Sequence, residues 1–161
     1  SRWRKSIVTD NGIAMFNGLC EETRAVNNGL LIDDTGVLAD IDHIGFNVAQ
    51  DNGEELNFAW TKSGQTDTEL IAALDTLVLA TWVKTGFLYQ PVVTGKPAAE
   101  RIAVVLNGSE QSTYGTAAQI ALATFPDAEE LQWATGAKGG EGTAATYDVD
   151  WVGFAQEKRN S

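Results

Sequence analysis

Two aspartates near the C-terminus have the spacing that comes closest to a catalytic pattern. Asp148 and Asp150 are separated by one residue in a segment that alternates polar and apolar side chains. If this segment is a strand, both carboxylates lie on one face, about 7 Å apart. Paired acids at a similar separation cleave glycosidic bonds when one acid has a raised pKa beside a substrate cleft. The spacing therefore raises a hydrolase as one hypothesis.

The residues that follow the pair argue against that hypothesis. The β-sandwich glucanases carry a further Glu later on the same strand, where this chain has Gly153 and Phe154. We therefore interpret Asp148 and Asp150 as strand-face acids that meet solvent or a neighbouring molecule.

Other catalytic signals are weak. The single histidine, His43, is expected on the strand face opposite Ile44 and Phe46, and the sequence offers no evident partners for it. The sequence has no zinc-type Cys/His cluster, no phosphate-binding lysine loop and no Gly-x-Ser-x-Gly motif. We predict a protein that is not an enzyme and that uses no cofactor.

A calcium site is the other use that carboxylates suggest, because Ca²⁺ takes oxygen ligands. The candidates lie in the segment between residues 21 and 40, which we read as a long surface loop with at most one helical turn. A second group, Asp51 and Asn52, lies at a predicted hairpin, and neither group has EF-hand spacing. We expect no metal, and the weak candidates in the loop are Asp33, Asp34 and Asp40.

The charge balance excludes some partners. The formal net charge is −11, with 22 acidic against 11 basic side chains, which argues against a nucleic-acid-binding face. No run of about 18 apolar residues is present, so no transmembrane helix is predicted. Basic residues gather at the two ends, which we expect either to be solvated or, if they dock on a partner, to contact an acidic protein surface. The candidate contacts are Arg2, Trp3, Arg4, Lys5, Lys158 and Arg159.

Length and cysteine content indicate one domain over residues 1–161. The single cysteine, Cys20, has apolar neighbours and is predicted to be a small buried hydrophobe. The chain begins at Ser1 with a strand-like segment. We expect either that it was processed or that an N-terminal strand lies upstream.

The first half of the chain predicts two hairpins. Residues 2–8 and 13–20 read as strands joined by the turn at Asp10-Asn-Gly, and the second is apolar on both faces, which is typical of a strand covered on both sides. Residues 42–50 and 56–60 alternate around Asp51-Asn-Gly and give the strongest hairpin signal. Residues 69–79 fit either a strand or a short helix.

The second half continues in the same way. Residues 82–89 read as a strand, and residues 101–106 form a strand that ends at Asn107-Gly108, which suits a primed turn. Residues 116–124 predict a short helix with Ile120 and Leu122 facing inward.

The C-terminal stretch from residue 143 to 156 reads as the longest strand. Its apolar register shifts by one after Trp151, which predicts a β-bulge near Trp151–Val152.

Short alternating strands with regular turns predict an all-β, antiparallel two-sheet sandwich with one or two helical turns. Five tryptophans invite a sugar-binding interpretation, but core burial is the better default for most of them. Trp3 and Trp82 are left undetermined. The expected core anchors are Phe46, Phe58, Trp60, Phe87, Trp133, Trp151 and Phe154.

Five segments resemble the concanavalin A-like jelly-roll domains of tailed-bacteriophage structural proteins, and the likeness covers roughly residues 6–156. The segments are Asp42 to Phe46, Trp82 to Tyr89, Arg101 to Gly108, Ala123 to Asp127 and Val149 to Gln156. The resemblance implies a virion protein made in the host cytoplasm. Its most plausible role is a capsid decoration or cement protein, often a homotrimer, that binds the major capsid protein at the shell surface. The alternative is a glycan-binding domain of a virion fibre or lectin. Such domains usually have a strand upstream of the point where this chain starts.

Overall fold

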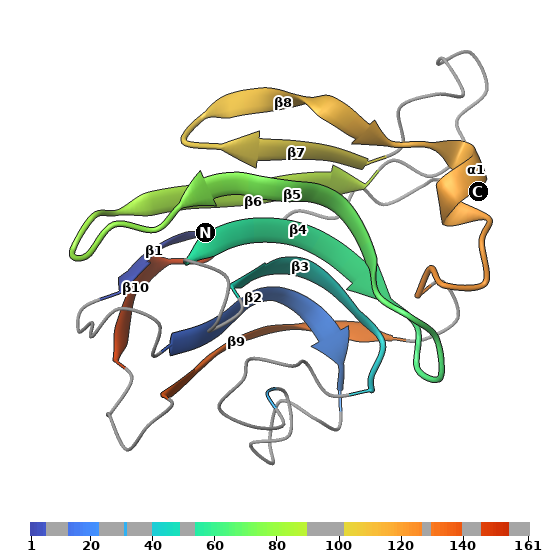
Figure 1. Cartoon of the computed structure of the whole chain (residues 1–161), viewed down its shortest axis with the longest axis horizontal. Helices are drawn as coiled ribbons and strands as arrows, with labels where there is room; N and C mark the ends of the chain where they lie inside the picture. Colours follow the sequence, from blue (N-terminus) through green and yellow to red (C-terminus); the bar gives the residue numbers. More distant parts are fainter. Residues whose placement is uncertain are drawn as a thin grey trace.

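The structure is an all-β sandwich of two antiparallel sheets (Figure 1). The computed structural model describes residues 1–5, 13–22, 31, 40–48, 54–89, 102–126, 130–139 and 146–154. Within these residues there are ten strands and one short helix, and each sheet has five strands. The predicted fold class, a jelly-roll-like two-sheet sandwich, is confirmed.

The first sheet has the strand order β10-β1-β6-β7-β8. It therefore joins the N-terminal strand to the last strand of the chain. Its strands are β1 (Arg2–Lys5), β6 (Val83–Tyr89), β7 (Ile102–Leu106), β8 (Ser109–Gly115) and β10 (Tyr147–Trp151).

The second sheet has the order β5-β4-β3-β2-β9. In Figure 1, β9 runs beside β2, although more than a hundred residues separate the two strands in sequence. Its strands are β2 (Ile13–Glu21), β3 (His43–Val48), β4 (Glu55–Thr61), β5 (Thr68–Thr76) and β9 (Leu131–Gly139).

The main core lies between the sheets and is rich in aromatic side chains. Phe46 and Phe58 are opposite each other on β3 and β4, and their ring centroids are 5.0 Å apart. Phe87 on the first sheet approaches Phe58 to 5.3 Å, while Trp60 packs against Phe125 at 5.7 Å. Phe46, Phe58 and Trp60 are buried and Phe87 is partly buried, so these four expected anchors do lie in the core.

A second hydrophobic cluster covers the outer face of β2. Phe16 and Cys20 point away from the main core and pack with Leu31 and Ile41, which come from the long connection between β2 and β3. Met15, on the opposite face, belongs to the main core. The predicted coverage of this strand on both faces is therefore correct.

The pairing of β3 with β4 and the turn at Asn107–Gly108 are present as predicted, while the turn residues predicted between β3 and β4 lie outside the described residues. β3 and β4 pair in unbroken register from His43 opposite Thr61 to Val48 opposite Leu56. β7 and β8 are joined at Asn107 and Gly108, whose φ angles of 51° and 87° are those of a primed turn.

The segment that fitted either a strand or a helix is the strand β5. Its pairing with β4 shifts register at two places, and Ala73, with φ 48°, lies within the first shift, between Asp75 and Ile71. The Ala73 N–H donates to Oδ1 of the buried Asn57 at 2.8 Å. Leu70 and Leu74 both reach the core, because residues four apart share a face of a strand as well as a face of a helix.

The helix α1 (Ala117–Ile120) is a single turn within the predicted span. Thr116 caps it, and Thr116 and Gln119 form a reciprocal capping box. Ile120 packs on the core as predicted, but Leu122 lies after the helix and is exposed, so that part of the prediction is wrong. Among the described residues, no helix has the length and apolar character needed to cross a membrane.

The predicted hairpin between the first two strands is wrong. β1 pairs with β10 and β6 in the first sheet, whereas β2 pairs with β3 and β9 in the second. The proposed turn at Asp10 lies outside the described residues. Two adjacent strands in sequence can enter opposite sheets of a sandwich, and local turn signals do not distinguish this arrangement from a hairpin.

The C-terminal strand is shorter than predicted. β10 has five residues, whereas β2, β5 and β9 have nine each. Trp3 is opposite Val149 and Arg2 is opposite Trp151, so Asp150 is the additional residue. The irregularity therefore precedes Trp151, one residue before the predicted position.

Candidate functional site: the Trp82 surface

Alternation along β1 places two of its residues on the outer face of the sheet and two inside the sandwich. Trp3 and Lys5 point into the sandwich and are only 2% and 3% exposed, whereas Arg2 and Arg4 lie on the outer face. Because β1 is flanked by β10 and β6, both arginines stand in the middle of an outer sheet surface.

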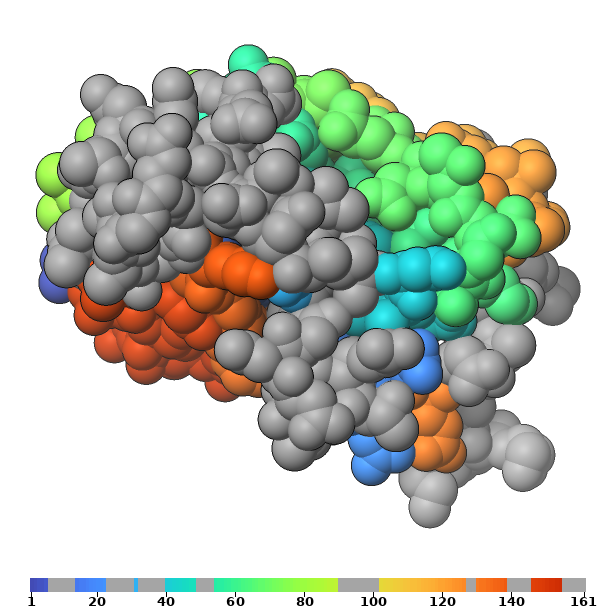
Figure 2. All heavy atoms as spheres, turned by 60° about the horizontal axis from the view of Figure 1, so that its bottom comes forward, coloured from blue at the N-terminus to red at the C-terminus, as the bar shows by residue number. Residues whose placement is uncertain are grey.

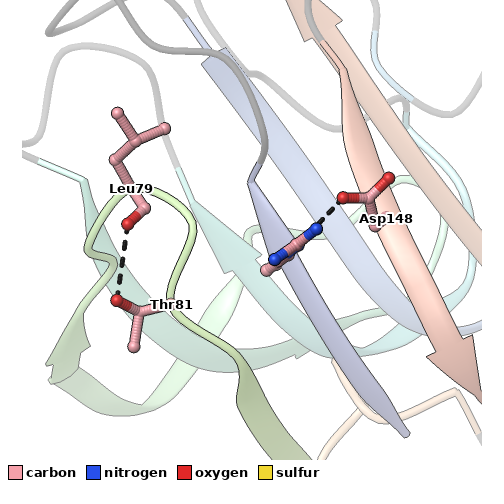
Figure 3. A network of polar contacts seen from close by, with 4 residues as sticks. Leu79, Thr81 and Asp148 are labelled. Atoms are coloured by element: carbon pink, nitrogen blue, oxygen red, sulfur yellow. Dashed lines mark hydrogen bonds and ion pairs between the residues drawn. The ribbon is translucent and has the colours of Figure 1, made fainter.

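Each arginine binds one of the two C-terminal aspartates. The Arg4 Nε lies 2.9 Å from Asp148 Oδ2, and Figure 3 shows this ion pair at Asp148. The Arg2 Nη1 lies 2.8 Å from Asp150 Oδ2. All four side chains remain partly exposed. The pair predicted to share a strand face does so, but each carboxylate already has a cationic partner.

Both arginines also contact one tryptophan. The guanidinium carbons of Arg2 and Arg4 each lie 4.6 Å from the centre of the Trp82 ring, which is cation–π geometry. Trp82 directly precedes β6, and this places its ring next to β1. We call this group with its neighbour on β10 the Trp82 surface. It comprises Arg2, Arg4, Trp82, Asp148, Asp150 and Trp151.

Trp151 belongs to this surface because of the bulge in β10. Residues directly opposite in a sheet share a face, so Trp151, opposite Arg2, faces outward with it. It is 49% exposed, and Phe154 beyond the strand is 72% exposed. The prediction that both anchor the core is therefore wrong. In Figure 2 the red atoms of the C-terminal segment form a continuous exposed patch beside the blue atoms of β1.

The turn before Trp82 adds apolar side chains at the margin. The Ala80 N–H donates to the Lys5 carbonyl at 3.0 Å, so the turn runs along the end of β1. Val78 and Leu79 in this turn are 60% and 49% exposed. Figure 3 shows Leu79 on one side of β1 and Asp148 on the other.

Two of the expected terminal partner contacts are instead structural. The Trp3 indole N–H donates to Thr85 Oγ1 at 2.9 Å inside the sandwich, and the buried Lys5 ammonium is paired with Glu54. Neither side chain can reach a partner without unfolding. Lys158 and Arg159 lie outside the described residues.

Trp133, the remaining expected anchor, is half-buried at the side of the core. Its indole N–H donates to Asn17 Oδ1 at 3.3 Å. Asn17 in turn donates to Ser1 Oγ at 2.9 Å. This ring is therefore held by a polar network between the sheets as well as by apolar packing.

The lone histidine is buried rather than exposed. His43 is 1% exposed, its ring meets Phe16 edge-on at 5.7 Å, and Nδ1 lies 3.1 Å from the Ile41 carbonyl, to which it donates. Burial lowers the pKa of His43 below its ordinary value, and the acidic residues Asp67 and Asp42 oppose that shift. A neutral ring wedged beside a phenylalanine serves packing, not proton transfer to a ligand.

The metal candidates do not assemble into a described site. Asp40 Oδ1 accepts the Gly64 N–H at 2.6 Å, and Asp42 Oδ1 accepts the Ser63 N–H at 2.7 Å, so these acids hold the turn between β4 and β5. Asp33 and Asp34, like Asp51 and Asn52, lie outside the described residues. Within the described part of the chain, no group of three or more His, Cys, Asp or Glu side chains is arranged to hold a metal ion.

The Trp82 surface is suited to recognition through contact. It offers the Trp82 ring with two arginines held against it, the exposed indole of Trp151, and two partly exposed ion pairs. Sequence reasoning did not identify Trp82 as part of it, although the two alternating pairs, Arg-x-Arg and Asp-x-Asp, were a usable signal for neighbouring strands. The missing information was that β1 and β10 are adjacent strands.

The geometry of this surface is the main basis for interpretation, because comparison with protein-family models, with curated proteins and with solved structures finds no significant match to the chain.

Proposed function

We propose that this protein is a capsid decoration or cement protein of a tailed bacteriophage, a homo-oligomer that binds the major capsid protein through the Trp82 surface. The observation that carries the proposal is the exposed Trp151 beside the fixed Arg2–Trp82–Arg4 group. The five sequence segments that resemble phage jelly-roll domains supply the virion context.

The composition of this surface is that of a protein interface. Tryptophan and arginine are enriched among the residues that dominate binding energies, and their contacts gain strength when the partner excludes water. The ion pairs restrict Arg2 and Arg4 before binding, so less side-chain entropy is lost on association. A decoration protein stabilises a shell by adding such buried contacts across its surface, without chemistry.

Co-sedimentation with empty shells of the parent phage tests this function. The unmodified protein should sediment with shells at a fixed ratio, and Trp151→Ala should weaken binding about tenfold or more. Leu122→Ala is the matched control, because Leu122 is also about half exposed but lies next to α1. Equal binding by both variants would remove the Trp82 surface from the interface, and failure of the unmodified protein to bind shells would contradict the function.

A glycan-binding role is the alternative, and one observation favours it. Trp151 presents an exposed indole beside the hydrogen-bonding groups of Arg2 and Asp150, a combination that can stack on a sugar ring and bind its hydroxyls. Trp82 is less available for this purpose because two guanidinium groups cover it. This role would be established instead if the protein binds a glycan array, if Trp151→Ala abolishes that binding, and if the protein does not bind shells.

A further inference from the structure

The four edge strands of the sandwich differ in how well they are protected against pairing with another strand. Natural edges are commonly blunted by bulges, charges or short length, because an open edge presents unpaired N–H and C=O groups. β10 is short and bulged and carries Asp148 and Asp150. β5 shifts register twice, and the pairing of β8 with β7 is also interrupted. β5 and β8 further approach each other where the two sheets meet.

β9 has none of these irregularities. Among the described residues it ends the second sheet, and it pairs with β2 in unbroken register over nine residues, from Leu131 opposite Glu21 to Gly139 opposite Ile13. It contains no proline, and Lys138 is its one charged residue. In an antiparallel strand, every second residue directs its N–H and C=O away from the paired neighbour. The β9 backbone is therefore the edge best suited to accept another strand.

The side chains of β9 are held toward their own molecule. Thr135 Oγ1 donates to the Phe16 carbonyl at 3.2 Å, Gln132 Nε2 donates to the Glu22 carbonyl, and Lys138 Nζ donates to the Leu31 carbonyl at 3.2 Å. The one lysine of the strand thus has a partner in its own chain.

We propose that β9 pairs antiparallel with β9 of a second copy, with Thr135 on a twofold axis, so that the two second sheets form one continuous sheet. The nine residues of the two copies overlap fully only when Thr135, the central residue, is opposite Thr135 of the other copy. This register places Trp133 opposite Ala137, Leu131 opposite Gly139, and Gln132 opposite Lys138. Large side chains then meet small ones and no like charges face each other, so the edge is complementary to itself. A twofold pair replaces the trimer as our expectation for the isolated protein.

Reciprocal charge changes at Gln132 test the register. Because Gln132 faces Lys138 of the other copy twice in the pair, Gln132→Lys should weaken the dimer and Gln132→Glu should strengthen it, each by roughly two- to thirtyfold. The dissociation constants come from sedimentation equilibrium over a range of protein concentrations. Net charge alone predicts the opposite order, since the chain carries −11 and added lysine reduces repulsion.

Gln111 on β8 provides the matched control. Its side chain also donates to a backbone carbonyl, that of Ser109 at 3.1 Å, and it lies on a different edge. Gln111→Lys and Gln111→Glu should leave dimerisation unchanged. A monomer at all concentrations, a trimer, or equal effects at the two positions would overturn the proposal.

Disulfide trapping gives a readout that does not depend on affinity. Thr135→Cys places two thiols opposite each other across the axis, and Cys20 is buried. Oxidation should give a covalent dimer that is absent for Gln111→Cys. If Thr135→Cys fails to cross-link while the protein dimerises, another surface forms the dimer. A tighter complex with an extended peptide of another protein, with no self-association, would likewise show that a second copy is not the occupant.

Discussion

The outer faces of the two sheets differ in what lies over them. On the second sheet, Phe16 and His43 are buried beneath Ile41 and Leu31, so the chain covers this face with its own residues. On the first sheet, the Trp82 surface stays open and is organised by ion pairs and cation–π contacts. The first arrangement contributes to folding stability, whereas the second leaves an aromatic and charged surface exposed.

The closest contact between β2 and β3 lies on the covered face. Gly18 and Gly45 are opposite each other, and a Cβ at Gly18 would lie 2.4 Å from the Ile44 carbonyl oxygen and 2.9 Å from the Phe16 ring. A Cβ at Gly45 would lie 2.6 Å from the Gly18 Cα, so both positions require glycine for the two strands to approach this closely. By contrast, a Cβ at Gly86 in the first sheet meets no atom within 4 Å.

The largest expected difference between the faces is in the cost of truncating an aromatic side chain. Phe16→Ala should lower the free energy of unfolding by about 3–5 kcal/mol, because it leaves a cavity in the outer cluster. Trp151→Ala should lower it by about 1 kcal/mol or less, because half of the ring is already in water. Urea unfolding of both variants measures the two costs. Similar costs would show that the faces are not energetically distinct.

Alanine at the two glycines should give the next largest difference. Gly18→Ala should destabilise by about 3 kcal/mol, because backbone atoms must move to accept the Cβ. Gly86→Ala should change stability by less than about 0.5 kcal/mol, since its site is open. Thermal unfolding followed by circular dichroism compares the two. A neutral Gly18→Ala would contradict the close strand approach.

The covered face should also make stability depend on pH. Burial lowers the pKa of His43 in the folded state, so the unfolded chain takes up a proton more readily. Stability from this group is present above the unfolded value of about 6.5 and is lost as the pH falls toward the folded pKa. Urea unfolding at about pH 7.5 and about pH 5.5 should therefore show a smaller loss for His43→Gln than for the unmodified protein. An equal loss would assign the pH dependence to other groups.

The smallest effect should come from the ion pairs of the open face. Asp148→Asn should cost less than about 1 kcal/mol, because the Arg4–Asp148 pair is partly exposed. The cost should shrink at about 1 M salt, where exposed charges are screened. Urea unfolding at low and high salt measures it. A larger cost that salt does not change would mean that the pair supports folding as the covered cluster does.

Much of the local structure followed from short patterns. Alternation placed Phe46, Phe58 and Trp60 on inward faces, and the turn between β7 and β8 followed from Asn107 and Gly108, whose conformations are locally determined. Asp148 and Asp150 could likewise be placed on one face without knowledge of their partners. These features depend on neighbours in sequence, so the sequence contains the information directly.

The candidate site depended on a contact between two strands that are far apart in sequence, β1 and β10. β1 pairs with β10 across more than 140 residues, and no local pattern specifies which distant strand will be its neighbour. Shifting a strand by one residue exchanges its faces, and the bulge at Asp150 therefore decided that Trp151 would lie outside.

The sequence by itself thus determined that β2 would be covered on both faces, because a strand with hydrophobic side chains on both faces is stable only where both are covered. Only the tertiary structure decided that Ile41 and Leu31 provide that cover and that Arg2, Arg4 and Trp82 meet the C-terminal aspartates. Side-chain periodicity is a local property, whereas register between distant strands is selected by packing of the whole sandwich.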